Sequence, residues 1–229
     1  MLSKTLGFIL PDESVYKILG SGRTDAKVSA LDTAFELFLE GHQISDPTDF
    51  LALFNRNLPP DIRVTAIKTV NEDFNVIQHS KLKEYIYLFS FGEKNHPFCA
   101  PFLANIIDVL DLEAMMEATN LFVGTHDFKA YTSRVRAQVN NVRTINRCEI
   151  LKNDLLKANF FPETSYALHV EGTGFMRYQI RMIMGALIQV GQGILGFSDI
   201  EASLLPNSNI EMTFVAPGSG LLLNRVDFR

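Results

Sequence analysis

The stretch SYALHVEGTGFMRYQIRMIMGALIQVG, residues 165–191, contains a strand pattern followed by a helix pattern. Residues 165–172, SYALHVEG, have the pattern of a strand. Arg177 and Arg181 are one turn apart on one face of the helix predicted over residues 175–191. Another face of that helix is apolar and is expected to be buried; it consists of Ile180, Ile183, Met184 and Leu187.

Other stretches extend this mixture of strands and helices. Asp111 is a plausible N-cap and Gly124 a plausible end for a further helix. Strand patterns occur at residues 83–91, at residues 220–228, and where Ile62, Val64 and Ala66 alternate after a Pro-Pro turn. Because strands and helices are interspersed without a strict βαβ rhythm, the sequence predicts the α+β class.

Residues 28–41, VSALDTAFELFLEG, fit two kinds of secondary structure. The segment reads as an amphipathic helix, but alternate residues from Leu31 to Leu39 also line one face of a strand. The pattern leaves both open.

The composition describes a folded chain of 229 residues, 47% hydrophobic and 21% charged. Its two cysteines, Cys99 and Cys148, have no metal-ligand spacing and suggest a reducing compartment. The apolar run at residues 182–190 is too short to span a membrane, and the start lacks a signal-peptide pattern, so we expect a cytoplasmic protein. A net charge of −5 argues mildly against nucleic-acid binding, but arginines cluster between residues 134 and 147, which leaves a basic face open.

Familiar cofactor and hydrolase motifs lack the context that they require. GQGILG, residues 191–196, matches a dinucleotide-binding pattern, but a helix precedes it, so we interpret it as a turn before a helix capped by Ser198 and Glu201. GTHDF, residues 124–128, could hold a His-Asp dyad but reads more simply as a turn in which Asp127 bonds backbone. The five histidines are scattered and no P-loop or G-x-S-x-G occurs, so we expect no metal and no nucleotide cofactor.

GSGRTDAKVSALD, residues 20–32, places Arg23 and Asp25 beside a flexible Gly-Ser-Gly turn. Such a cluster is either a solvated surface turn or a reactive carboxylate. A neighbouring arginine favours the ionised carboxylate that a nucleophile needs.

Several blocks, read in order, resemble the TruA-type tRNA pseudouridine synthase family. The first surrounds Asp25, and KEYIY at residues 83–87 resembles the strand that carries an active-site tyrosine, here Tyr85. Residues 172–193 resemble the core helix with an active-site arginine, here Arg181. The remaining blocks are residues 58–64, 124–131, 140–150 and 216–228.

This resemblance implies a fold of two similar α+β halves that share a long, mostly antiparallel sheet, with helices on one side and an active-site cleft between the halves. HPFCAPF, residues 96–102, is the expected boundary, giving an N-terminal half of residues 1–100 and a C-terminal half of residues 101–229. The chain is expected to begin within the first helix of the family fold, without its first strand. The resemblance also implies a homodimer that binds tRNA.

The implied reaction isomerises uridine to pseudouridine in the anticodon stem-loop, at tRNA positions 38–40, without a cofactor. Asp25 would be the nucleophile, Arg23 would help displace the target nucleotide, and Arg181 would pair with Asp25. Tyr85 would stack on the target uracil and act as the general base that removes its C5 proton. Four further arginines would contact RNA phosphates: Arg134, Arg136, Arg143 and Arg177.

Three residues depart from the family pattern. Lys27 stands where glycine is usual, Ser29 where histidine is usual, and Ile77 where arginine is usual. Together with the missing first strand, they motivate one alternative, an RNA-binding paralogue or truncated form with little or no catalysis. A second alternative, an interaction domain unrelated to RNA, would require the ordered match of blocks to be accidental.

Overall fold

The computed structural model describes residues 1–41, 43–133 and 140–228, and it divides into two compact units. The first unit comprises residues 1–22 and 34–79, and the second comprises residues 23–33 and 80–229. Each unit has its own hydrophobic core. The boundary expected after residue 100, and the cleft expected between similar halves, stay predictions.

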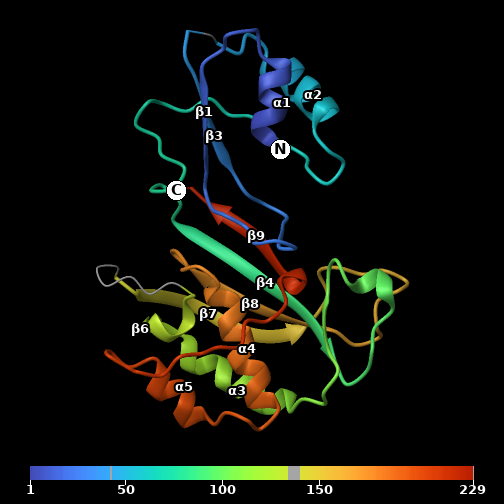
Figure 1. The fold of residues 1–229 in the computed structure, drawn as a ribbon, viewed down its shortest axis with the longest axis vertical. Helices are drawn as coiled ribbons and strands as arrows, with labels where there is room; N and C mark the ends of the chain where they lie inside the picture. The colour runs from blue at the N-terminus through green and yellow to red at the C-terminus, as the bar shows by residue number, and fades with distance from the viewer. Residues whose placement is uncertain (42, 134–139, 229) are drawn as a thin grey trace. The chain divides into compact units, whose positions relative to one another are not determined.

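The first unit packs two helices against a two-stranded antiparallel sheet (Figure 1). Its core contains Leu6, Phe54 and Leu58. The Asp46 carboxylate caps the second helix by accepting hydrogen bonds from the backbone N–H groups of Thr48 and Asp49. The elements are α1 (Leu2–Ile9), β1 (Tyr16–Gly20), β3 (Phe35–Leu39) and α2 (Pro47–Asn57).

The strand predicted around Ile62, Val64 and Ala66 is wrong, since this segment is neither helix nor strand. Asn55, on α2, supplies the hydrogen bonds that a neighbouring strand would otherwise make. Its side-chain amide donates to the Val64 carbonyl at 2.8 Å, and its side-chain oxygen accepts from the Val64 N–H at 2.8 Å. The alternation of apolar residues therefore reflects packing against the first core rather than a sheet.

The second unit contains a mixed sheet in the order β2-β9-β4-β8-β7-β6, with β5 beside β4. Only β2 with β9 and β4 with β5 run parallel among the described pairs, so the expected α+β class with a mostly antiparallel sheet is confirmed. The strands are β2 (Ser29–Ala30), β4 (Leu82–Phe91), β5 (Ala104–Ile106), β6 (Gly124–Asp127), β7 (Val142–Lys152), β8 (Tyr166–Gly172) and β9 (Leu221–Asp227).

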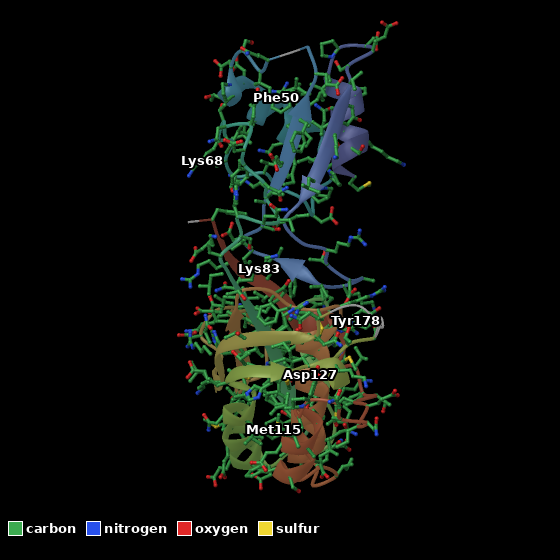
Figure 2. All side chains as sticks on the ribbon, turned by 90° about the vertical axis from the view of Figure 1, so that its left-hand side faces the viewer. Phe50, Lys68, Lys83, Met115, Asp127 and Tyr178 are labelled. Carbon is green, nitrogen blue, oxygen red and sulfur yellow. The ribbon has the colours of Figure 1, made fainter. Side chains whose placement is uncertain are left out.

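Helices cover one face of this sheet (Figure 1). Tyr87 and Phe89 of β4 point into the core beneath them, whereas Ile86 and Leu88 face a smaller cluster on the other side. Met115 of α3 lies in the helical layer, packed against α4 (Figure 2). The helices are α3 (Leu112–Thr119), α4 (Gln179–Gly191) and α5 (Phe197–Ser203), with short 3₁₀ turns at Pro97–Cys99, Asn120–Phe122, Lys129–Tyr131 and Gly218–Gly220.

Several local predictions are confirmed and others change at their ends. Asp111 caps α3 by accepting from the Ala114 N–H at 3.0 Å, but α3 ends at Thr119 and continues as a 3₁₀ turn before Gly124. The turn between α4 and α5 is confirmed, although α5 begins after Gly196. The Gly196 N–H donates to the Asp199 carboxylate at 2.7 Å. Residues 28–41 form strands β2 and β3 rather than a helix.

Candidate active site

The loop that carries Asp25 is held at the edge of the large sheet. Its residues 29–30 form β2, which pairs in parallel with Leu222 and Leu223 of β9. The N–H of Leu31 also donates to the Leu223 carbonyl at 2.8 Å. These backbone bonds fix the end of the loop a few residues after Asp25.

Asp25 itself begins a tight turn. Its carbonyl accepts from the Val28 N–H at 3.1 Å, and Lys27, the third residue of the turn, has a φ of 67°. A left-handed residue at the third position is the mark of a type II turn, where glycine is favoured. Lys27 therefore adopts the conformation suited to the glycine that the family usually has there.

Asp25 and Arg181 form the ion pair that the resemblance implies. Nη1 of Arg181 lies 3.3 Å from Oδ2 of Asp25, and the two side chains are 16% and 28% exposed. The pair is thus partly shielded from water, which strengthens its attraction relative to a surface pair. Arg181 extends from the first turn of α4.

Backbone contacts hold the Arg181 side chain in place. Its Nε donates to the Ala216 carbonyl at 2.7 Å, and the Ala216 N–H donates to the Arg181 carbonyl at 3.0 Å. The segment of residues 214–216 can approach α4 this closely because Gly185 has no side chain. A Cβ there would lie 2.1 Å from the Phe214 carbonyl oxygen. On the same segment, a Cβ on Gly218 would lie 2.7 Å from the Ala26 carbonyl oxygen of the Asp25 loop.

Tyr85 of β4 lies close enough to Asp25 for the carboxylate charge to affect the pKa of its phenol. Burial raises the pKa of the Tyr85 phenol, and the negative charge of Asp25 raises it further. The ring packs edge-on against Phe175, with 5.3 Å between the centroids. The structure therefore brings Asp25, Arg181 and Tyr85 together, with Tyr85 in its neutral form.

Tyr87, the next tyrosine on the same face of β4, is fully buried. Its hydroxyl donates to the Pro217 carbonyl at 2.7 Å. Burial raises its pKa, while the positive charge of Arg181 acts in the opposite direction. Tyr87 thus supports the segment that holds Arg181, a contribution that the sequence analysis did not assign, although the repeated tyrosine in KEYIY marks its position.

Tyr178, at the beginning of α4, is a further residue of the site that no sequence motif had indicated (Figure 2). The guanidinium carbons of Arg181 and Arg177 lie 5.0 and 4.8 Å from the centre of its ring. Arg177 also donates to the Tyr178 hydroxyl at 3.2 Å. The predicted helix spanning residues 175–191 therefore begins at Gln179, since Tyr178 has a left-handed φ of 66°.

The remaining predicted residues are placed to different degrees. Arg23 and Arg177 are exposed. Arg143, at the start of β7, donates from Nη1 to the carbonyls of Asn140 and Val142 at 2.8 and 2.7 Å. Arg134 and Arg136 lie outside the described residues.

Metal-ligand clusters and membrane-spanning helices are both absent from the part of the chain that the structure describes. No three or more His, Cys, Asp or Glu side chains there are grouped so that they could hold a metal ion. None of the described helices has the length and apolar character needed to cross a membrane. Asp127 of GTHDF accepts from the Lys129 N–H at 2.9 Å, as expected, although residues 124–127 form strand β6.

Comparisons with known proteins show which family this chain resembles in sequence. A sequence model of the family described as tRNA pseudouridine synthase matches residues 118–229. "tRNA pseudouridine synthase A 2" of Bacillus anthracis is 30% identical over 212 residues, which cover 93% of this chain and 82% of the relative. "tRNA pseudouridine synthase A" of Staphylococcus aureus (strain N315) is 31% identical over 211 residues, 92% of this chain and 74% of the relative.

The comparisons define an isomerase of the pseudouridine synthase class. Within that class, the chain belongs to the TruA-type tRNA pseudouridine synthase family.

Proposed function

We propose that this chain converts uridine to pseudouridine in the anticodon stem-loop of tRNA, with Asp25 as nucleophile and without a cofactor. The observation that carries the proposal is the Asp25–Arg181 ion pair at 3.3 Å, beside Tyr85. A carboxylate is nucleophilic only when ionised, and a partly shielded guanidinium partner favours that form.

The reaction is an internal exchange of bonds. The bond between C1′ of the ribose and N1 of uracil breaks, the base turns, and C1′ bonds to C5. The proton leaves C5 and N1 gains one, so no oxidant, reductant or water is consumed. Asp25 attacks either the ribose or the base, and both routes require an unprotonated carboxylate.

The target base must leave its stack before it can react, which costs a few kcal/mol. Arg23 is exposed two residues before Asp25, and it is proposed to occupy the space that the nucleotide leaves. Tyr85 offers an aromatic platform for the extruded base. Arg177 and Arg143, with Arg134 and Arg136, are proposed to bind phosphates.

The family resemblance further supports a homodimer that acts in the cytoplasm. Sedimentation with and without tRNA would test whether the chain is a dimer.

The decisive variant is Asp25→Asn, which preserves the size of the side chain but removes its charge and nucleophilicity. We expect tRNA labelled with tritium at C5 of uridine to release no measurable tritium with this variant, because isomerisation expels that proton. Retention of tRNA on a filter should stay close to that of the wild type.

The matched control is Asp12→Asn, an exposed aspartate of the first unit, which should release tritium at the wild-type rate. Turnover by Asp25→Asn would overturn the assignment of the nucleophile. Retention of tRNA without turnover by the wild type would favour the RNA-binding paralogue instead.

A further inference from the structure

Tyr178 has a backbone conformation that tyrosine rarely adopts. Its φ of 66° and ψ of 2° lie in the left-handed region, directly before the first residue of α4. Outside glycine, this region is populated mainly by Asn, Asp and His, and a bulky residue there is strained. Such strain persists only where the surrounding contacts hold the residue, so those contacts indicate what the residue does.

The contacts of Tyr178 lead to the charged pair of the proposed active site. The Arg181 guanidinium carbon lies 5.0 Å from the centre of the Tyr178 ring, within the range of a cation–π interaction. Nη1 of the same guanidinium meets Asp25, and its Nε meets the Ala216 carbonyl. The aromatic ring is therefore a third support for the group that faces Asp25.

The same ring also holds Arg177. That guanidinium carbon lies 4.8 Å from the ring centre, and Nη2 donates to the hydroxyl at 3.2 Å. The Arg177 carbonyl in turn accepts from the Thr132 hydroxyl at 3.3 Å. One tyrosine thus contacts an exposed arginine and a partly buried arginine at once.

We propose that Tyr178 is a positioning residue: its ring face holds the Arg181 guanidinium in the orientation that pairs with Asp25. This inference rests on the proposed function of Asp25. Asparagine tolerates the left-handed region better but has no aromatic ring to contact Arg181. The strain of tyrosine at position 178 is therefore offset by the contact that its ring makes.

Turnover of a variant series separates the ring from the hydroxyl and from the strain. Tyr178→Leu keeps an apolar side chain without an aromatic face, and we expect kcat to fall about 3- to 30-fold. KM should rise by a smaller factor, because Arg177 also loses its contact with the ring. Tyr178→Phe keeps the ring and should retain kcat within about twofold. Loss of phosphate contacts alone would instead raise KM and leave kcat unchanged. Arg177→Gln should show this combination.

Tyr178→Asn tests the strain. Asparagine tolerates the left-handed region, so this variant should unfold at a temperature about 2–4 °C above that of Tyr178→Leu while its kcat stays as low. Glu13 has a φ of 67° on the exposed surface of the first unit, so Glu13→Asn is the matched control. It relieves the same kind of strain and should leave turnover unchanged.

A measurement on the free protein keeps the inference separate from catalysis. A proton above an aromatic face is shifted upfield by the ring current, so the Nε–H signal of Arg181 should be shifted in the wild type and in Tyr178→Phe. The shift should disappear in Tyr178→Leu, and Arg181→Lys assigns the signal.

The outcomes divide clearly. Wild-type kcat in Tyr178→Leu, or a kcat in Tyr178→Phe as low as in Tyr178→Leu, would overturn the positioning role while Asp25→Asn still tests the function. A ring-current shift that follows the ring in a protein without turnover would support the geometry and refute the proposed function alone.

Discussion

Lys27 shows how a single backbone angle shapes the turn that begins at Asp25, the proposed nucleophile. It is the third residue of the turn that begins at Asp25, and its φ of 67° is one that a side chain with a Cβ disfavours by roughly 1–2 kcal/mol. The turn is nevertheless closed by the bond from the Val28 N–H to the Asp25 carbonyl. Contacts of the loop with β9 must therefore outweigh the strain.

We expect Lys27→Gly to raise the free energy of unfolding of the second unit by up to about 1 kcal/mol. Glycine removes the strain but adds roughly 0.5–1 kcal/mol of conformational entropy to the unfolded chain, so the gain is smaller than the strain itself. Urea unfolding followed by circular dichroism measures the change. Lys27→Val, β-branched and poorly suited to positive φ, should lower the same quantity, and a stability loss in the glycine variant would contradict the turn.

The raised pKa of Tyr85 predicts how turnover depends on pH. Burial and then the charge of Asp25 raise its pKa, so its phenolate is scarce near neutral pH and increases as the pH rises towards that pKa. If Tyr85 removes the C5 proton as a phenolate, as we expect, turnover should increase from pH 7 to pH 9. Tyr85→Phe should slow turnover roughly 10²- to 10⁴-fold, with little change in tRNA affinity and a flat profile over this range. A wild-type profile that is equally flat would restrict Tyr85 to stacking.

The residues proposed to react carried a sequence signal, but the pairing between them did not. Asp25 and Tyr85 lie in recognisable blocks, whereas no spacing rule pairs Arg181 with a residue 156 positions earlier. The family resemblance supplied that pairing. The left-handed angles of Lys27 and Tyr178 could not be predicted, because neither residue type favours them and only tertiary contacts impose them.

Strand β9 connects the parts of the site at the scale of elements. It pairs with β2 of the Asp25 loop on one side and with β4, which carries Tyr85, on the other. A bulge at Asn224 shifts the register between Glu84 and Tyr85. The Asn224 side chain donates to Glu84 at 2.8 Å, so Glu84 holds the bulge that aligns both neighbours of β9.

Glu84 should make the stability of the second unit sensitive to acid. Burial by itself raises its pKa, but hydrogen bonds from Asn224 and His169 and the charges of His169 and Arg225 outweigh burial, so the pKa lies below its ordinary value. A lowered pKa contributes stability above the unfolded value of about 4.3, and this is lost as the pH falls through that value towards the folded pKa.

We therefore expect Glu84→Gln to cost about 1–2 kcal/mol of unfolding free energy at pH 7, and less at pH 3. Glu149→Gln is the control, since Glu149 is 41% exposed and its bond from Arg147 should contribute less than about 1 kcal/mol. Urea unfolding at both pH values measures the difference. Equal losses for Glu84→Gln at pH 7 and pH 3 would refute the role of its charge.

Strands with sheet partners on both sides were the most predictable elements. β4 and β8 are confirmed, because their apolar residues meet neighbours on each edge and each face. Residues 61–67 have a comparable alternation but form no strand, since Asn55 satisfies the backbone of Val64. Periodicity records which side of a chain is buried, and it does not record which partner makes the hydrogen bonds.

At the scale of the whole molecule, the chain leaves the first unit for residues 23–33 and then returns to it. The first unit closes both ends of this loop: Gly20 pairs with Phe35, and the Ser21 N–H donates to the Ala34 carbonyl at 2.9 Å. The ordering of the Asp25 loop therefore depends on two folded units, one at its ends and one along its length.

The two cores differ greatly in size, which predicts the order in which the units unfold. Among the described residues, the core cluster of the first unit contains the buried side chains of Leu6, Phe54 and Leu58, surrounded by partly buried ones. The main core of the second unit draws on the large sheet and on α3, α4 and α5. Because stability rises with buried apolar area, the first unit should open at lower urea concentration.

Opening of the first unit should stop turnover before the second unit unfolds, because it releases both ends of the Asp25 loop. Phe54→Leu, in the first core, should lower the urea concentration that abolishes turnover, at a cost of about 0.5–3 kcal/mol. Phe122→Leu, equally buried but in the second unit, should instead lower the midpoint for α4 and leave the first opening unchanged. Hydrogen exchange read peptide by peptide follows both units in one experiment. If turnover in Phe54→Leu disappeared only together with the protection of α4, the Asp25 loop would depend on the second unit alone.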